Sequence, residues 1–251
     1  MFRLPNIFLY TAFLFFYACS EPINKQSKDY NASTSVDSTI LEDAEFSEII
    51  LPYKTKLDSE MNKVIGYADT ILSNEGSEGE SSLGNFVADL MLFQSNKIFK
   101  DTVHLAVINA RGGLRVPINQ GEITVGEIFE LMPFDNEVLV VEVKGDELFQ
   151  LFSLTAKKAV NVFSPATFII RNQQADSIRI DSLPIIADKI YNVAISDYLA
   201  NGGGGFDFLM DNKRYDLNIM LRDMILMHIE ELSEEKKRVY AKRDGRIKLK
   251  N

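Results

Sequence analysis

Residues 109–115 carry the side chains of this chain that are best suited to holding an anionic or carbonyl oxygen. They read NARGGLR, so two arginines, Arg111 and Arg115, flank a pair of glycines. Glycine lets the backbone approach a ligand closely, and the guanidinium group offers a rigid fork of donors. The structural alternative is a tight strand exit with two surface arginines.

Two further segments present an aromatic ring beside turn residues. Residues 132–136 read MPFDN and place Phe134 in a turn, while residues 196–206 place Tyr198 ahead of four consecutive glycines. Rings in such positions can stack on a planar base. The alternative for Phe134 is a structural role as a buried residue of the hydrophobic core. Four glycines in a row carry a large ordering cost, which favours a functional reason for the second segment.

This chain contains few of the residue types and motifs that usually carry out catalysis. The sequence holds one cysteine and two histidines, and it lacks the serine-nucleophile and phosphate-loop glycine motifs. His104 falls in an apolar strand and His228 in a helix, so we expect both to be structural. We therefore predict no catalytic residue, no metal ligand and no cofactor in this chain. The net charge of −9 argues against a nucleic-acid partner.

The N-terminus has the layout of an export signal. A short positive start precedes an apolar run over residues 7–17 and then Cys19. This arrangement resembles the lipobox of bacterial lipoproteins, so we predict a signal peptide over 1–18 and lipidation of Cys19. The product would be an exported bacterial lipoprotein, membrane-anchored in the periplasm or at the cell surface. The alternative is an ordinary signal peptide with a chance cysteine. Residues 19–44 are polar and predict a flexible tether.

From residue 45 onwards, helix and strand patterns alternate, which predicts an α+β or α/β layered domain over 45–251. Pro52 is expected to break a helix over 46–64. The other predicted helices cover 84–98, 125–131, 145–159 and 218–237, and the predicted strands cover 64–72, 105–108, 138–143, 167–171, 177–180 and 190–195.

A set of short motifs occurs in an order and spacing typical of one family. The motifs are ESSLGN at 80–85, GGLR at 112–115, GEIT at 121–124, PFDN at 133–136, KG at 144–145, YLANGG at 198–203 and DGRI at 244–247. On these motifs the chain resembles the C-terminal domain of 5′-nucleotidases, a family that includes bacterial UDP-sugar hydrolases and the animal ecto-5′-nucleotidase.

The resemblance implies mixed β-sheets packed with helices and a site that grips a nucleoside or nucleotide. By position, Phe134 and Tyr198 would clamp the base, and Arg115 would contact the substrate. The other residues placed at the ligand are Asn109, Arg111, Asn201, Gly202 and Gly203. In the family a separate metallophosphatase domain holds two metals and the catalytic histidine, so divalent metals are expected only on a partner chain.

Departures from the family pattern concern the same site. One extra residue separates Asn109 from the glycines, which leaves open whether Asn109 or Arg111 takes the contact. Gly204 stands where the family has an aspartate for the ribose hydroxyls, and residues 74–79, just ahead of Glu80, include no arginine. The Asp-x-His and Gly-Asn-His motifs of the metallophosphatase domain do not occur.

Together these features predict the nucleotide-binding half of a 5′-nucleotidase-type phosphohydrolase. It would work with a separate catalytic chain in nucleotide catabolism and would be inactive alone. The alternative is a non-catalytic lipoprotein, a binding or interaction module whose nucleotide site has degenerated. A third possibility is an enzyme with chemistry of its own that no motif reveals.

Overall fold

The computed structural model describes residues 37, 40–75 and 79–250. The predicted signal peptide, Cys19 and the tether up to residue 36 lie outside the described residues. The chain divides into two compact units, residues 1–50 and 51–251. In the part of the chain that is described, no helix combines the length and hydropathy needed to span a bilayer.

Helix α2 (Ala44–Met61) runs through Pro52 without a break, so the expected interruption is wrong. None of its side chains is buried. The carbonyl that loses its hydrogen-bond donor at the proline can therefore bind water, which lowers the cost of a proline inside a helix.

The second unit is built on a five-stranded mixed sheet in the order β10-β4-β9-β2-β5. Strands β2 and β9 run parallel, and the other neighbours are antiparallel. Alternate residues face opposite sides, so Ala106 and Ile108 enter one core while Leu105 and Val107 enter the other. The strands are β2 (Leu105–Asn109), β4 (Glu137–Lys144), β5 (Asn161–Ser164), β9 (Ile190–Ser196) and β10 (Arg214–Met220).

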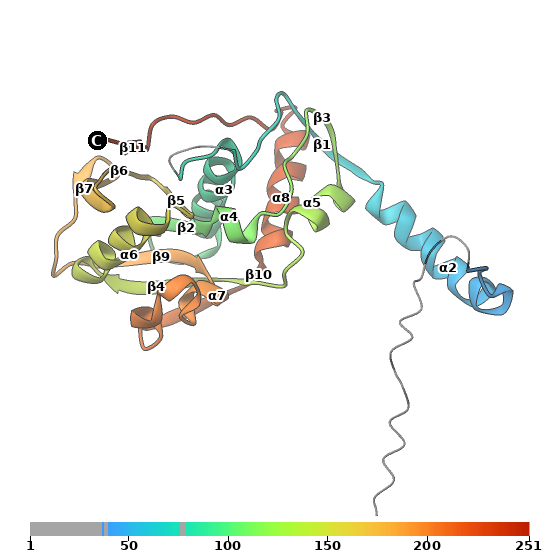
Figure 1. Ribbon diagram of the computed structural model, residues 1–251, viewed down its shortest axis with the longest axis horizontal. Helices are drawn as coiled ribbons and strands as arrows, with labels where there is room; N and C mark the ends of the chain where they lie inside the picture. Colours follow the sequence, from blue (N-terminus) through green and yellow to red (C-terminus); the bar gives the residue numbers. More distant parts are fainter. Residues whose placement is uncertain (1–36, 38–39, 76–78, 251) are drawn as a thin grey trace, which may run out of the picture. The chain divides into compact units, whose positions relative to one another are not determined.

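The face of this sheet that carries Ala106 and Ile108 is covered by three helices and one antiparallel pair of strands. These elements are α3 (Ser82–Ile98), α5 (Val125–Leu131), α8 (Leu221–Glu234), β1 (Val64–Ala68) and β3 (Gly121–Thr124). Figure 1 shows α3 and α8 side by side, and the two helices are in contact. Helix α5 has the bounds that the sequence predicted and begins at a capping box in which Thr124 and Glu127 exchange hydrogen bonds.

The second face carries α6 (Gly145–Lys158) and a four-stranded sheet in the order β11-β6-β7-β8. Phe152 and Phe163 stack at 4.5 Å between ring centroids in this core. The strands are β6 (Ala166–Arg171), β7 (Gln174–Ile180), β8 (Leu183–Pro184) and β11 (Ile247–Leu249). The layered α+β architecture is therefore confirmed.

The predicted helix over 218–237 starts later than expected. Residues 214–220 form strand β10, and Asn218 adopts a φ of 53° within it. The helix pattern begins at Leu221, whose side chain is fully buried. Strand β10 pairs with β4 over Arg214 to Asp216, and this long-range pairing leaves no local signal in so short a segment.

Candidate ligand-binding site

The three segments singled out in the sequence meet at one edge of the five-stranded sheet. Parallel strands β2 and β9 both end there, at Asn109 and Ser196. Strand β4 runs antiparallel to β9 and begins at Glu137, directly after residues 132–136. The carboxyl ends of parallel strands are a common place for ligands, because the loops that leave them converge.

Arg222 of helix α8 holds the loop that carries Phe134. The Arg222 side chain is 10% exposed, and its Nη2 donates to Asp135 Oδ1 at 2.7 Å. Its Nη1 donates to the carbonyl oxygens of Met132 and Phe134 at 3.3 and 3.4 Å. The guanidinium also lies 4.4 Å from the ring centroid of Phe129. The loop backbone is thus held from the core while the Phe134 residue stays 40% exposed.

Tyr198 lies on the short helix α7 (Asp197–Ala200) and packs against the glycine run. A Cβ at Gly203 would come within 2.6 Å of the Tyr198 ring and 2.4 Å of its carbonyl oxygen. The other three glycines of residues 202–205 adopt positive φ values. The run therefore has a structural reason at each position, namely a left-handed backbone or room for the ring.

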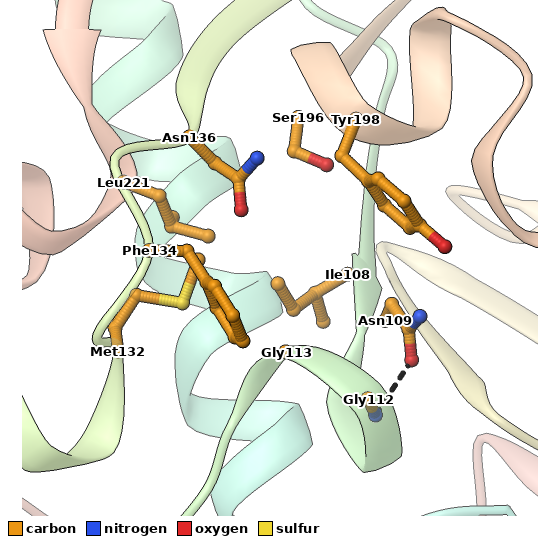
Figure 2. Close-up of a pocket in the computed structure, with 10 residues that line it drawn as sticks. All are labelled: Ile108, Asn109, Gly112, Gly113, Met132, Phe134, Asn136, Ser196, Tyr198 and Leu221. Atoms are coloured by element: carbon orange, nitrogen blue, oxygen red, sulfur yellow. Dashed lines mark hydrogen bonds between the residues drawn. The ribbon is translucent and has the colours of Figure 1, made fainter. Parts of the chain in front are cut away.

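A cavity of about 300 Å³ lies between the two loops. Figure 2 shows Phe134 and Tyr198 on opposite sides of it, and both residues are exposed rather than buried in the core. The separation of their ring centroids, expected at about 7–8 Å for a stacked base, stays a prediction. The lining residues are Ile108, Asn109, Gly112, Gly113, Met132, Phe134, Asn136, Ser196, Tyr198 and Leu221.

The chemistry of this lining is aromatic and apolar with neutral polar groups. The described residues that form it include no carboxylate, imidazole, ammonium or guanidinium group. Such a pocket can bury a planar ring and offer side-chain amides and hydroxyls to the edge of that ring. It holds no group suited to moving a proton near neutral pH.

Asn109 is the N-cap of a single helical turn, α4 (Ala110–Gly113). Its Oδ1 accepts the backbone N–H of Gly112 at 2.8 Å, as drawn in Figure 2. Ala110 and Arg111 both lie within this turn, and Asn109 lines the cavity.

The two predicted arginines lie elsewhere. Arg111 and Arg115 line a neighbouring open cavity of about 680 Å³ together with Glu75. Asn201, Gly202 and Gly203 are not among the residues that line the ring pocket. Asn201 Oδ1 accepts a hydrogen bond from Arg214 at 2.8 Å. The predicted set thus divides into ring-pocket residues, a pair of arginines beside them, and residues that support the Tyr198 loop.

His228 lies in helix α8 as the sequence predicted, whereas His104 lies one residue before strand β2 rather than within it. His104 Nδ1 accepts the backbone N–H of Asn192 at 3.1 Å, and His228 Nδ1 lies 3.0 Å from the side-chain nitrogen of Gln94. Burial lowers the pKa of both imidazoles. Within the described residues, no three His, Cys, Asp or Glu side chains cluster in a way that could hold a metal ion. These residues therefore do not fit the dinuclear metal site of a metallophosphatase.

Several important residues escaped the sequence reasoning. Asn136 and Ser196 line the cavity, and Asp197 and Arg222 hold its walls. The first three lie inside or beside the quoted segments and could have been included on position alone. Arg222 lies about ninety residues from Phe134 along the chain, and no short pattern connects them.

A family comparison matches residues 64–211 to the 5′-nucleotidase C-terminal domain. The chain belongs to this family. Similar curated proteins include the trifunctional nucleotide phosphoesterase protein YfkN of Bacillus subtilis, 27% identical over 233 residues, and the human 5′-nucleotidase, 26% identical over 250 residues. Both matches cover 85% of this chain but only 16% and 42% of the relatives.

A solved structure gives the same result for the fold. The 5′-nucleotidase precursor from Thermus thermophilus superimposes with a TM-score of 0.70 at 27% identity. The match covers 84% of this chain and 44% of that chain. This chain thus spans less than half the length of the relatives described here.

Other family motifs serve to tie down the C-terminal segment. The Glu80 carboxylate accepts hydrogen bonds from the side chain of Asn85 at 2.9 Å and from the backbone of Asp244 and Gly245 at 2.7 and 3.1 Å. Arg246, with a side chain that is 10% exposed, forms ion pairs with Asp89 and Asp244. These residues are structural and lie outside the lining of the ring pocket.

Proposed function

We propose that this 5′-nucleotidase C-terminal domain binds the base of a nucleoside or nucleotide between Phe134 and Tyr198. The supporting observation is a pair of exposed rings on opposite sides of an uncharged pocket. Exposed aromatic faces are poorly solvated by water, so a planar base that stacks on them is bound more favourably. Each aromatic ring that stacks on a base contributes about 1–3 kcal/mol to the free energy of binding. The amides of Asn109 and Asn136 can then pair with the edge of the base.

In this proposal the chain supplies substrate binding for a 5′-nucleotidase-type phosphohydrolase in nucleotide catabolism. Hydrolysis would come from a metallophosphatase on a separate chain. The match covers 42% of the human 5′-nucleotidase and 44% of the Thermus thermophilus 5′-nucleotidase precursor, so more than half of each relative lies outside the part that resembles this chain. The proposal assigns hydrolysis to that remaining part.

Calorimetry with the full purified chain tests the binding half of the proposal. We expect adenosine and AMP to bind, and we expect the AMP solution to release no phosphate in the presence of Mn²⁺. The Tyr240→Ala variant is a matched control, because Tyr240 is 56% exposed and does not line the pocket. Absence of any nucleoside or nucleotide binding would contradict the proposal.

Affinity capture from membranes tests the partner. A metallophosphatase should co-purify with this chain, and mixing the two proteins should raise the rate of phosphate release from AMP above that of either alone. Unchanged phosphate release by the mixture would favour the second candidate, a non-catalytic binding module. Gly204 favours that candidate, because it offers no carboxylate to a ribose where the family has one.

Membrane attachment is part of the same proposal and rests on the sequence around Cys19. Metabolic labelling with a radioactive fatty acid should mark the wild-type protein. The Cys19→Ser variant should remain unlabelled and leave the membrane fraction. Equal membrane association of the two would contradict the lipid anchor.

A further inference from the structure

A second cavity of about 380 Å³ lies beside the hairpin formed by β7 and β8. It shares no lining residue with the ring pocket. Most of its wall is apolar, and the rim residues Leu183 and Ile186 are 67% and 60% exposed. Exposed apolar side chains gathered at a cavity are typical of a binding site. The apolar lining residues are Val103, Pro165, Ile180, Leu183, Pro184, Ile186 and Tyr191.

His104 contributes a hydrogen-bond donor to this cavity. Its Nδ1 accepts the backbone N–H of Asn192 at 3.1 Å, so the neutral ring carries its proton on Nε2. Among the described residues no hydrogen-bond partner is found for that Nε2–H. Burial and the nearby ammonium group of Lys189 lower the pKa of His104, which keeps the ring neutral.

Lys189 contributes a positive charge. Its Nζ lies 4.8 Å from the ring centroid of Tyr191 and forms no ion pair with a carboxylate of the described residues. Asp181 is the one acidic side chain among the described lining residues, and it lies in the exposed turn between β7 and β8. The wall therefore offers one cation and one neutral donor to a ligand. Two carboxylates lie near this pair, Asp181 in the wall and Asp101, which acts on His104. A ligand with one negative charge is therefore favoured over a ligand with two.

We propose that this cavity binds a small amphipathic monocarboxylate, one with an aromatic or branched aliphatic body. The apolar body would lie against the rim and Tyr191, and the carboxylate would accept hydrogen bonds from Lys189 Nζ and His104 Nε2. This site is independent of the nucleoside proposal, because no residue belongs to both cavities.

Titration of the full chain with phenylbutyrate, followed by calorimetry and by the NMR signals of Tyr191, tests the site. We expect a dissociation constant of about 1 mM or tighter. The neutral analogue phenylbutyramide should bind more weakly. Lys189→Gln should weaken phenylbutyrate binding by about threefold to fivefold, because it removes the solvent-exposed attraction between the Lys189 ammonium group and the carboxylate of the ligand. The affinity for the neutral amide should stay unchanged.

Two further variants complete the design. Lys157→Gln removes another exposed lysine that does not line the cavity, and it should have no effect. Ile186→Trp should fill the cavity from its exposed rim and weaken both probes. Equal affinity for the acid and the amide, an unchanged affinity in Lys189→Gln, or signal changes confined to Phe134 and Tyr198 would each overturn the proposal.

Discussion

The side-chain amide of Asn136 donates a hydrogen bond of 2.8 Å to Asp197 Oδ1. This contact joins the loop of Phe134 to the helix of Tyr198, so the two backbone segments that carry the rings are linked to each other. Asp197 Oδ1 also accepts the backbone N–H of Tyr198 at 2.7 Å. The backbone carbonyl of Asn136 in turn accepts the N–H of Leu221 at 2.8 Å.

Breaking this contact should weaken nucleoside binding without touching either ring. Asn136→Ala and Asp197→Ala should each reduce adenosine affinity, and the double variant should lose less than the sum of the two. We expect a coupling energy of about 0.5–1.5 kcal/mol, the usual contribution of one such hydrogen bond. Calorimetry on the four proteins measures it. Strictly additive losses would show that the contact does not position the rings.

Removing either ring should have a larger effect. Tyr198→Ala and Phe134→Ala should each weaken adenosine binding by about 1–3 kcal/mol, since each loses one stacking face. Tyr198→Phe keeps the face and should retain most of the affinity. Both residues are partly exposed, so melting temperatures should change little. Wild-type affinity in both alanine variants would remove the clamp from the proposal.

Gly203→Ala tests the packing beneath Tyr198. The new methyl group would overlap the tyrosine ring and its carbonyl oxygen, so the ring must move. We expect a loss of about 1–3 kcal/mol in the free energy of unfolding and weaker adenosine binding. Gly113→Ala is the matched control for stability, because a Cβ there meets no atom within 4 Å. Equal stability of the two variants in chemical denaturation would be inconsistent with this packing.

Arg222→Met tests the support of the Phe134 loop. It leaves the carbonyls of Met132 and Phe134 without this donor, and we expect a loss of about 2–3 kcal/mol in unfolding free energy. Adenosine affinity should fall as well, although Arg222 does not line the pocket. Arg238→Met is the control, because its ion pair with Asp69 is exposed and should contribute at most about 1 kcal/mol.

The ion pair between Asp244 and Arg246 predicts a pH dependence of stability. The side chain of Arg246 donates hydrogen bonds to Asp244 and holds the pKa of that carboxyl below its usual value. Its contribution to stability is therefore present above about pH 4, the value for an unfolded chain, and is lost as the pH falls through the folded pKa.

Denaturation of wild type and Asp244→Asn at several pH values measures this effect. The difference in unfolding free energy should be full near neutral pH and should shrink below about pH 4. Asp211→Asn, at an exposed carboxylate away from this cluster, should show no such trend. A difference that stays constant down to about pH 2 would refute the assignment.

The sequence predicted the parts of the fold that depend on local patterns. Helix α5 was predicted from the local pattern over 125–131, and strand β4 from its valine-rich run. The beginning of α8 was misplaced, because strand β10 is specified by pairing with β4 rather than by its own residues. The same limit applies to the site. Phe134 and Tyr198 were found from motifs, whereas Arg222 acts through a contact formed only in the folded chain.

Strands β2 and β9 bring their ends to one edge of a sheet with apolar cores on both faces. A ligand that binds there contacts loops that are anchored in this layered scaffold. Most of the conformational entropy lost on binding is then that of the ligand itself. Substitutions in these loops can change which ligand is bound while the sheet and the two cores stay intact.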